Sequence, residues 1–384
     1  MEKIHTMKKI AVVIPKFGLV GGAEQFASEL TGRLAANTDY DFHIFANRRQ
    51  MTNDGFSHHK VPLISFPKFL TTPGFARFVR RRLQSDDFSL VHTHERIYAA
   101  DIYTLHGVPH RYWVNRVRRK KMSLFDRATA RVEQKLVYEG GCRKFIAVSE
   151  LTREIFLDEY EVEPERVCVI HPGVNLSAYE NKDRQQIRRT VREALQIASD
   201  EFVVIFASMN FEIKGLDHII QSLAKLQTQD NKVRLIVAGK GNVKKYQKIA
   251  GDAQMAGRII FTGVVPGGEL VNLYLAGDIY MMLSQFDTFG MVVPEAMAAG
   301  LPVVISGRVG AKDLVREGEN GFVIENPSDH GCVASRVSLL FDAKRRKAMS
   351  AAARETAVEN SWEKTARLYQ EIYTEILDAK RIKG

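Results

Sequence analysis

The sequence predicts an α/β protein built from two doubly wound domains, and three observations lead to that fold class. The chain has 384 residues, more than one hydrophobic core usually organises. Short runs rich in Val and Ile alternate with helix-length segments, which is typical of parallel strands that are buried on both faces. A polar stretch, residues 175–200, separates two such series, so we expect the domain boundary there.

Eleven apolar runs are the expected strands, and each half of the chain should assemble its own parallel sheet. In the first half the runs cover residues 9–15, 42–46, 90–94, 101–107, 144–149 and 167–173. In the second half they cover residues 202–208, 233–241, 259–265, 279–284 and 302–306. Apolar residues between Trp362 and Leu377 recur at near-helical spacing, so residues 361–382 should form a long amphipathic helix.

The composition resembles that of an ordinary soluble protein, with 45% hydrophobic and 26% charged residues. No apolar run reaches the ~18 residues that a membrane helix needs, and the first ten residues contain no apolar signal core. Cys142, Cys168 and Cys332 are scattered, so they are expected to be reduced thiols and not a disulfide or metal framework. We therefore expect a cytoplasmic protein.

Basic residues are concentrated in the first half of the chain. Residues 1–196 hold 32 Lys and Arg against 23 Asp and Glu, whereas residues 197–384 hold 23 against 22. Such an excess suits an anionic partner, such as a phosphate, an acidic lipid or a nucleic acid, although it also serves solubility alone. No helix-turn-helix, zinc or RNA-recognition pattern is present, which argues against a nucleic-acid-binding protein.

Ligands of doubly wound sheets bind beyond the carboxyl ends of the strands, so the residues that follow the strands are the candidate site. Gly21 and Gly22 lie between the first strand and an expected helix at 22–36. Without Cβ atoms their backbone can approach a ligand closely, and a helix N-terminus favours an anion. A tight turn would explain the two glycines equally well. Because both halves present strand ends, we expect a cleft between the domains.

Charged residues follow two strands of the second half. Lys214 precedes an expected helix near Gly215, where a cation can meet a diphosphate or simply lie exposed. Asp287 and Glu295 bracket the expected start of another helix near Gly290, whose first turn has backbone N–H donors without intrahelical partners. Two carboxylates beside such donors suit a sugar nucleotide, since Glu295 can accept both hydroxyls of a ribose diol. Alternatively, Asp287 caps the helix and Glu295 lies at the edge of the core.

His92, His94 and His106 follow two strands of the first half, and His92 and His94 should point to one face of their strand. Three imidazoles raise the question of a metal site, but histidines at strand ends often only form hydrogen bonds. An Asp-x-Asp pattern at residues 39–41 precedes a strand, which is the wrong end of the sheet for a metal–diphosphate site. We therefore expect no metal ligands.

Motifs along nearly the whole chain resemble those of retaining glycosyltransferases of the GT-B fold, in the large family four. The most specific stretch is "EAMAAGLPV" (295–303), whose glutamate follows Asp287 with seven residues between them. The other matching motifs are "GGAEQ" (21–25), "TLHG" (104–107), "IKG" (213–215) and "FTG" (261–263). Within the family, the chain is most similar to lipopolysaccharide-core glucosyltransferases through "DRATARVEQ" (126–134) and "EPERVCVIHPGV" (163–174).

The resemblance implies a GT-B architecture, in which two Rossmann-like domains face a central cleft. Residues 1–180 would bind the acceptor, residues 181–360 would bind the nucleotide sugar, and helix 361–384 would pack back on the first domain. The implied activity is transfer of a hexose, with retention, from a nucleoside-diphosphate sugar such as UDP-glucose to a saccharide or lipid-linked acceptor. The setting would be cell-surface polysaccharide or lipopolysaccharide synthesis, without a cofactor or a metal.

The resemblance also implies roles for the matched residues. The catalytic residues would be His106, Lys214, Asp287 and Glu295. Of these, Glu295 would hold the ribose, Lys214 the diphosphate and Asp287 the donor sugar, with His106 near the reacting carbon. The loop 262–264 would read the base through its backbone groups. The remaining donor-binding residues would be Gly21, Gly22, Asn210, Thr262, Gly263, Val264, Phe289, Gly290, Met291 and Val292.

Two departures from the family pattern bear on the donor. The first acid is Asp287, where most family members have Glu, so the choice of donor sugar stays open. An arginine commonly accompanies the lysine, but Glu212 and Ile213 precede Lys214 here, so another cation replaces it or donor affinity is lower. The alternative activity is that of a sugar-nucleotide epimerase or phosphorylase of the same fold. Transfer to an acceptor without free phosphate would distinguish these activities.

A basic segment with aromatic residues, 110–121, is the candidate membrane contact. A short helix here would place Trp113 and Val117 one turn apart as an apolar ridge between cations. Aromatic residues with Lys and Arg are typical of an interfacial anchor, although a solvated helix can have the same composition. We expect peripheral binding at the inner face of the cytoplasmic membrane. The expected contacts are Arg111, Trp113, Arg116, Arg118, Arg119, Lys120 and Lys121.

Overall fold

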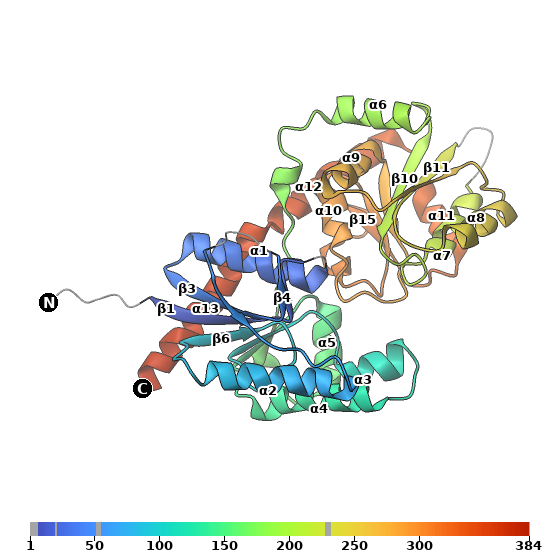
Figure 1. The fold of residues 1–384 in the computed structure, drawn as a ribbon. Helices are drawn as coiled ribbons and strands as arrows, with labels where there is room; N and C mark the ends of the chain where they lie inside the picture. Colours follow the sequence, from blue (N-terminus) through green and yellow to red (C-terminus); the bar gives the residue numbers. More distant parts are fainter. Residues whose placement is uncertain (1–6, 20, 51–54, 227–231, 384) are drawn as a thin grey trace. The chain divides into compact units, whose positions relative to one another are not determined.

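The computed structural model of the chain describes residues 7–19, 21–50, 55–226 and 232–383, and it confirms the expected α/β class. Two compact units are present, Met1–Pro172 with Trp362–Gly384 and Gly173–Ser361. Each unit is a Rossmann-like parallel sheet with helices packed on it (Figure 1). The main segment of the first unit ends at Pro172, whereas the domain boundary was expected at residue 180.

The first unit contains a seven-stranded sheet in which all neighbouring strands are parallel. Its central strands are buried, as their continuous apolar runs require. A two-stranded ladder, β2 (Lys16–Phe17) with β4 (Arg48–Arg49), follows two of them. Across the sheet the order is β5 (Ser57–Lys60), β3 (Tyr40–Ala46), β1 (Lys8–Val13), β6 (Leu90–Thr93), β7 (Ile102–Leu105), β8 (Lys144–Ala147) and β9 (Val167–Val169).

The helices of the first unit pack on this sheet and include the C-terminal helix. They are α1 (Gly22–Asn37), α2 (Thr71–Leu83), α3 (His110–Tyr112), α4 (Leu124–Glu139), α5 (Glu150–Glu159) and α13 (Trp362–Lys383), with the 3₁₀ turns η1 (Lys68–Leu70) and η3 (Pro164–Arg166) and the π-helical turn η2 (Trp113–Val117). Helix α13 packs against α1 and β6, and its Tyr369 and Tyr373 are fully buried. The end of the chain therefore completes the core of the first unit.

The second unit contains a six-stranded parallel sheet. Across the sheet the order is β12 (Ile259–Gly263), β11 (Val233–Gly239), β10 (Phe202–Ser208), β13 (Ile279–Met282), β14 (Val303–Ser306) and β15 (Gly321–Ile324). Its helices are α6 (Arg184–Ala194), α7 (Leu216–Ala224), α8 (Val243–Asp252), α9 (Gly267–Ala276), α10 (Val292–Ala298), α11 (His330–Ser338) and α12 (Ala343–Glu359), with the turns η4 (Leu176–Ala178) and η5 (Gly310–Leu314).

Both sheets have a switch point, at which successive strands of the chain stop adding to one side of the first long strand and begin adding to its other side. In the first unit it lies between β1 and β6, and in the second it lies between β10 and β13. The loops that leave these strands at a switch point diverge to opposite faces of the sheet. The crevice that they leave is where doubly wound folds bind their ligands.

All eleven expected strands are present, and the expected helix boundaries near residues 22, 215, 291 and 361 are confirmed within one residue. The strands β2, β4, β5 and β15 were not expected. Strand β5 has the sequence SHHK, without an apolar run, and β15 is only four residues long. The three cysteines are unpaired, as expected.

Candidate active site

The carboxyl ends of β10 and β13 bring together Lys214 and Asp287, two of the expected site residues. The ammonium group of Lys214 forms an ion pair with Oδ2 of Asp287. The two side chains are 21% and 17% exposed, so the charges are partly withdrawn from water and attract each other more strongly than a surface pair. The pair lies at the switch point of the second sheet, where a ligand site is expected.

Two glycines allow the loops that carry this pair to approach each other. Gly215 has a φ of +72°, and a Cβ there would overlap the backbone that follows β13. Gly290 has a φ of +92°, and a Cβ there would lie 2.8 Å from Cε of Met282. L side chains rarely adopt such backbone angles, and at Gly215 the neighbouring backbone leaves no room for one. The close packing of these loops is what lets Lys214 reach Asp287.

Asp287 has three hydrogen-bond partners besides the lysine. Its backbone N–H donates to the carbonyl of Arg308 at 2.9 Å, and its carbonyl accepts from the N–H of Gly310 at 3.0 Å. Oδ1 of Asp287 accepts from the N–H of Phe289 at 3.3 Å. The carboxylate therefore closes the turn before α10 with one oxygen and holds Lys214 with the other. Helix α10 begins without a side-chain cap, so Asp287 does not cap it as one interpretation expected, and its contact with a donor sugar stays a prediction.

Glu295 lies in the first turn of α10 and is partly buried. The hydroxyl of Tyr274 donates to Oε2 of Glu295 at 3.4 Å, a long hydrogen bond. Burial raises the pKa of Glu295 to about 7, and the bond from Tyr274 opposes part of that effect. The side chain is therefore only partly ionised at neutral pH. A ligand that donates hydroxyl groups to it would favour the ionised form.

Two residues of this site were missed by the sequence analysis. Tyr274 lies within the apolar stretch "LYLA" of α9, where it is indistinguishable from a core residue. Arg308, whose carbonyl holds Asp287, follows β14 in the loop "SGRVG". The rule that selected the other strand ends would have found Arg308 if it had been applied to that strand.

Asn210 and the loop after β12 lie beyond the ends of β10 and β12, the two strands that flank β11 in the second unit. Oδ1 of Asn210 accepts from the N–H of Ile213 at 3.1 Å, which shapes the turn leading to Lys214. Val264 is 62% exposed, and Gly263 has a φ of +73°. A cavity of about 410 Å³ opens beside this loop, between β12, α6 and α9. Backbone groups of the loop are thus accessible to a ligand, while Asn210 has a local structural role.

The three candidate histidines come together at the ends of β6 and β7 as a hydrogen-bonded cluster. Nδ1 of His94 lies 2.8 Å from Nε2 of His106, and His92 is bonded to the hydroxyls of Tyr373 and Thr104 at 2.7 and 2.8 Å. Burial lowers the pKa of His92 and of His106 to about 3, so both rings are neutral at physiological pH. Within the described part of the chain, no group of three His, Cys, Asp or Glu side chains is arranged to hold a metal ion.

Gly21 and Gly22 begin α1 at the switch point of the first sheet. A Cβ at Gly22 would meet open space, so the backbone there is approachable. The carboxylate of Glu24 lies directly beside Gly21. An anion bound at this helix start would meet that negative charge unless Glu24 turned away. The expected contact of these glycines with a diphosphate stays a prediction.

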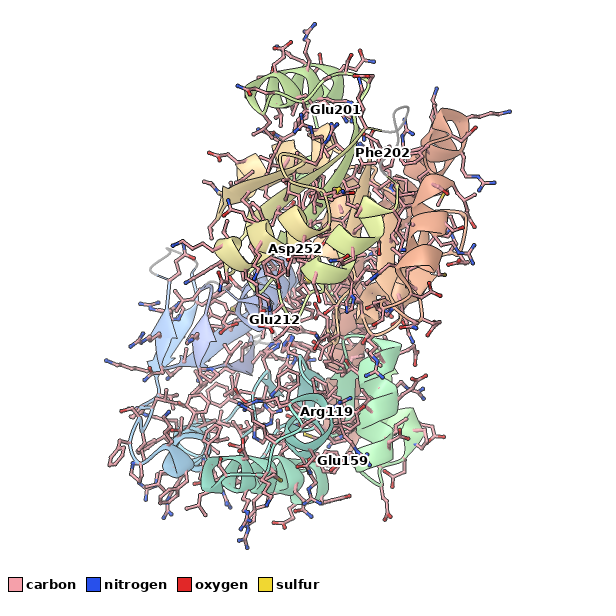
Figure 2. All side chains as sticks on the ribbon, turned by 90° about the vertical axis from the view of Figure 1, so that its right-hand side faces the viewer. Arg119, Glu159, Glu201, Phe202, Glu212 and Asp252 are labelled. Atoms are coloured by element: carbon pink, nitrogen blue, oxygen red, sulfur yellow. The ribbon has the colours of Figure 1, made fainter. Side chains whose placement is uncertain are left out.

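The basic segment, residues 110–121, lies on the surface but is not the regular helix that was expected. It passes through α3 into the π-helical turn η2, and Trp113 and Val117 are half-buried in it. They therefore do not form the expected exposed ridge. Glu159 of α5 pairs with Arg111 at 3.7 Å. Figure 2 labels Glu159 and Arg119, a cation near the end of the segment. The exposed cations are Arg111, Arg116, Arg118, Arg119, Lys120 and Lys121.

Two family models match the chain, one in each half. Residues 20–178 match the model described as Glycosyltransferase Family 4, and residues 187–356 match the model described as Glycosyl transferases group 1. A D-inositol 3-phosphate glycosyltransferase of Corynebacterium glutamicum is 30% identical over 236 residues, which cover 59% of this chain and 56% of that protein. An uncharacterized glycosyltransferase of Methanocaldococcus jannaschii is 24% identical over 301 residues, 74% of this chain and 76% of that one. The chain thus spans little more than half the length of the first relative.

Solved structures of glycosyltransferases have the same fold. WaaG, a glycosyltransferase involved in lipopolysaccharide biosynthesis, superposes with a TM-score of 0.79 at 19% identity, over 95% of this chain and 99% of that one. HepE of Anabaena, in complex with UDP-glucose, superposes with a TM-score of 0.73 at 19% identity, over 96% and 99% of the two chains. At these identities the likeness establishes the GT-B fold.

Glu295→Gln should stabilise the ligand-free protein above neutral pH. The raised pKa means that the folded state favours the protonated acid, so the parent loses stability as the pH rises from about 4.5 through about 7. A neutral amide removes that loss. The Tm of the variant should therefore exceed that of the parent at pH 8 and equal it near pH 4. Glu355→Gln, at an exposed position of α12, is the matched control. Equal Tm values for Glu295→Gln and the parent at pH 8 would contradict the burial argument.

Proposed function

Because the chain belongs to the glycosyltransferases of group 1 and family 4, we propose that it moves a hexose, with retention, from a nucleoside-diphosphate sugar to a saccharide or lipid-linked acceptor. The proposed donor is UDP-glucose, which is bound in the similar structure of HepE. The proposed setting is cell-surface polysaccharide or lipopolysaccharide synthesis, the pathway named for WaaG. The observation that carries the donor site is the group of Lys214, Asp287 and Glu295 in the second unit.

Glu295 is the proposed ribose ligand. Its ionised carboxylate can accept hydrogen bonds from two neighbouring hydroxyls, and such charge-assisted bonds are stronger than neutral ones. The pKa of about 7 without ligand means that binding a diol would release a proton near neutral pH. Tyr274 holds one carboxylate oxygen in place and keeps the side chain at the edge of the site.

Lys214 and Asp287 are proposed to exchange partners when the donor binds. A diphosphate carries more negative charge than one carboxylate, so it competes with Asp287 for the ammonium group of Lys214. The oxygen of Asp287 that is released can then accept a hydroxyl of the donor sugar. The other oxygen stays bonded to Phe289 and keeps the carboxylate in position.

In the proposed reaction, the bond between C1 of the sugar and the diphosphate oxygen breaks while the acceptor oxygen bonds to C1 from the same face. The departing diphosphate takes up the hydroxyl proton of the acceptor, and the sugar passes through an oxocarbenium-like state. Fixed donors that face the departing phosphate usually supply most of the rate enhancement. Lys214 and the backbone N–H groups at Gly290, Met291 and Val292 are the donors that we propose.

The roles proposed for residues of the first unit rest on the resemblance of their motifs. His106 is proposed to lie near the reacting carbon, and Gly21 and Gly22 to contact the diphosphate. In the second unit, the loop 262–264 is proposed to read the base. Asn210 is assigned to donor binding because it shapes the turn before Lys214.

We also propose that the first unit binds an anionic membrane surface. Six exposed cations of the basic segment would each contribute about 1 kcal/mol near an anionic leaflet. Beside them, Leu124 is 69% exposed at the start of α4, and Phe66 is 86% exposed before η1. Both α3 and η1 pack against α4, so these charged and apolar side chains are carried by adjoining elements. Across the described residues, no helix is long and apolar enough to cross a membrane.

A thermal-shift panel of UDP-, GDP- and ADP-sugars tests the proposed function. A donor that binds the folded state raises its Tm by mass action. UDP-glucose should give the largest increase, and the protein should then transfer glucose without releasing free phosphate. Failure of every nucleotide sugar to raise the Tm would contradict the assignment.

Glu295→Ala should weaken UDP binding while the fold survives. Losing a charged acceptor of the ribose hydroxyls costs roughly 1.5–3 kcal/mol, which corresponds to about a tenfold to hundredfold increase in Kd. Calorimetric titration with UDP measures this, with Glu355→Ala as the control variant. Parental affinity in a folded Glu295→Ala protein would show that the ribose role is wrong.

Transfer activity should persist in EDTA. The negative charge of the departing diphosphate is assigned to Lys214 and to backbone donors, so chelation removes none of the proposed groups. The assay compares rates before and after EDTA treatment and after adding Mg²⁺ or Mn²⁺. Activity that EDTA abolishes and either ion restores would reject metal independence.

The protein should co-sediment with phosphatidylglycerol vesicles, not with neutral ones, and high salt should release it. Changing Arg116, Arg118, Arg119, Lys120 and Lys121 to Gln should abolish sedimentation and leave UDP binding intact. The matched control changes five exposed cations of the second unit, Lys244, Lys248, Lys344, Arg345 and Lys347, to Gln. Phe66→Ser with Leu124→Ser should weaken binding without changing charge. Equal binding of the parent to both vesicle types would contradict the proposal.

A further inference from the structure

Two histidines at the ends of neighbouring strands form a pair in the first unit. Nδ1 of His94, which follows β6, lies 2.8 Å from Nε2 of His106, which follows β7. His94 is only 6% exposed, whereas His106 is partly exposed at the carboxyl end of the sheet. One buried imidazole therefore bonds a ring nitrogen of a second imidazole that lies at the carboxyl end of the first unit's sheet.

The remaining nitrogen of His94 is buried and has no hydrogen-bond partner among the described residues. If this Nε2 carried a proton, the N–H group would have lost its hydrogen bond to water on folding without gaining a partner in the protein. Such an unsatisfied donor costs about 1–3 kcal/mol of folding free energy. Orphaned buried N–H groups are also rarer in native proteins than under-satisfied acceptors. The proton of His94 therefore belongs on Nδ1, which faces an acceptor. His92 differs, because both of its nitrogens are bonded to hydroxyls.

We propose that His94 is a positioning residue whose Nδ1–H donates to Nε2 of His106, and that this bond fixes His106 in the tautomer with its proton on Nδ1. The lone pair of Nε2 is then occupied and Nδ1 already carries hydrogen. His106 therefore has no nitrogen with which to accept a proton from a substrate. Insofar as it concerns glycosyl transfer, this inference rests on the proposed function. In that reaction His106 is a fixed polar ring and not a general base.

The surroundings of the pair hold both rings in this arrangement. The ring of Phe26 meets His106 edge-on at a centroid distance of 4.8 Å and also contacts Trp362 of α13 at 5.1 Å. The rings of His94 and His106 are 5.1 Å apart and nearly parallel. Burial lowers the pKa of His106 to about 3 and lowers that of His94 well below its ordinary value. Both rings therefore stay neutral at physiological pH, so each ring has a single protonated nitrogen and a defined tautomer.

The direct test is ¹⁵N NMR of the ligand-free protein labelled in its histidine side chains, in which protonated and unprotonated ring nitrogens differ in chemical shift. The two signals are assigned by their loss in His94→Asn and His106→Gln. His106 should show a protonated Nδ1 and an unprotonated Nε2. A proton on Nε2 of His106 in the parent protein would overturn the proposal. This readout needs no substrate, so it is independent of the proposed function.

Kinetics then separates positioning from mere stability. His94→Leu removes the donor and should lower kcat about fivefold to tenfold, the worth of one hydrogen bond, with UDP affinity unchanged. His94→Asn keeps an N–H near the Nδ1 position and should restore kcat together with the tautomer of His106. His218→Asn, which breaks the His218–His330 pair of 3.2 Å in the second unit, is the matched control and should leave kcat unchanged.

The positioning role would be overturned if His94→Leu had the same kcat as the parent protein. It would also be overturned if His94→Leu and His94→Asn lost the same fraction of kcat. If His94→Leu does not fold, the spectrum of the parent and the kcat of His94→Asn decide the question. If the parent turns over no nucleotide sugar at all, the proposed function fails, and the spectrum alone decides the tautomer.

Discussion

The ion pair between Lys214 and Asp287 is the interaction on which the candidate site depends. It joins the loops after β10 and β13, where the second sheet reverses its strand order, and two glycines with positive φ make that approach possible. Each charge is only partly hydrated, so neither residue can be removed without leaving the other uncompensated. The pair keeps the ammonium group of Lys214 in place where we propose that a diphosphate binds.

Glu295 illustrates a different constraint, since its carboxylate has one long hydrogen bond and no cationic partner in the described structure. Burial without compensation destabilises the ionised form. Stability alone would favour a neutral side chain at this position. A glutamate at this position contributes little to the fold, and a ligand that donates hydrogen bonds to it, as we propose for the ribose, would compensate the ionised form.

Much of the fold and part of the site could be predicted from the sequence, for reasons that individual residues make clear. Strand β10, "FVVIFAS", is buried almost throughout, and a continuous apolar run of that length is typical of a central parallel strand. Lys214 and Asp287 were singled out because they lie in the loops after such runs, and Glu295 because it lies at the start of the helix that follows Asp287. Tyr274 could not be found, because a buried tyrosine on an apolar helix has the same pattern whether or not its hydroxyl meets a carboxylate.

Local backbone geometry also escaped the sequence analysis. The basic segment was expected to be a regular helix, but a π-helical turn at Trp113–Val117 leaves its aromatic and aliphatic side chains half-buried. Strongly exposed apolar residues lie instead at Leu124, the first residue of α4, and at Phe66, which precedes η1. Tertiary packing brings the cations of the basic segment and these apolar side chains onto adjoining elements. The periodicity of a single segment could not predict that arrangement.

The most direct test of the donor site is the affinity for UDP of Lys214→Met in the background of Asp287→Asn. In that background Lys214 no longer neutralises a carboxylate, so any effect of its removal reports on the ligand. We expect Kd, measured by calorimetric titration, to rise about tenfold or more, since a charged hydrogen bond contributes about 1.5–3 kcal/mol. An unchanged Kd would show that Lys214 serves only to balance Asp287, and it would contradict the assignment of the diphosphate site.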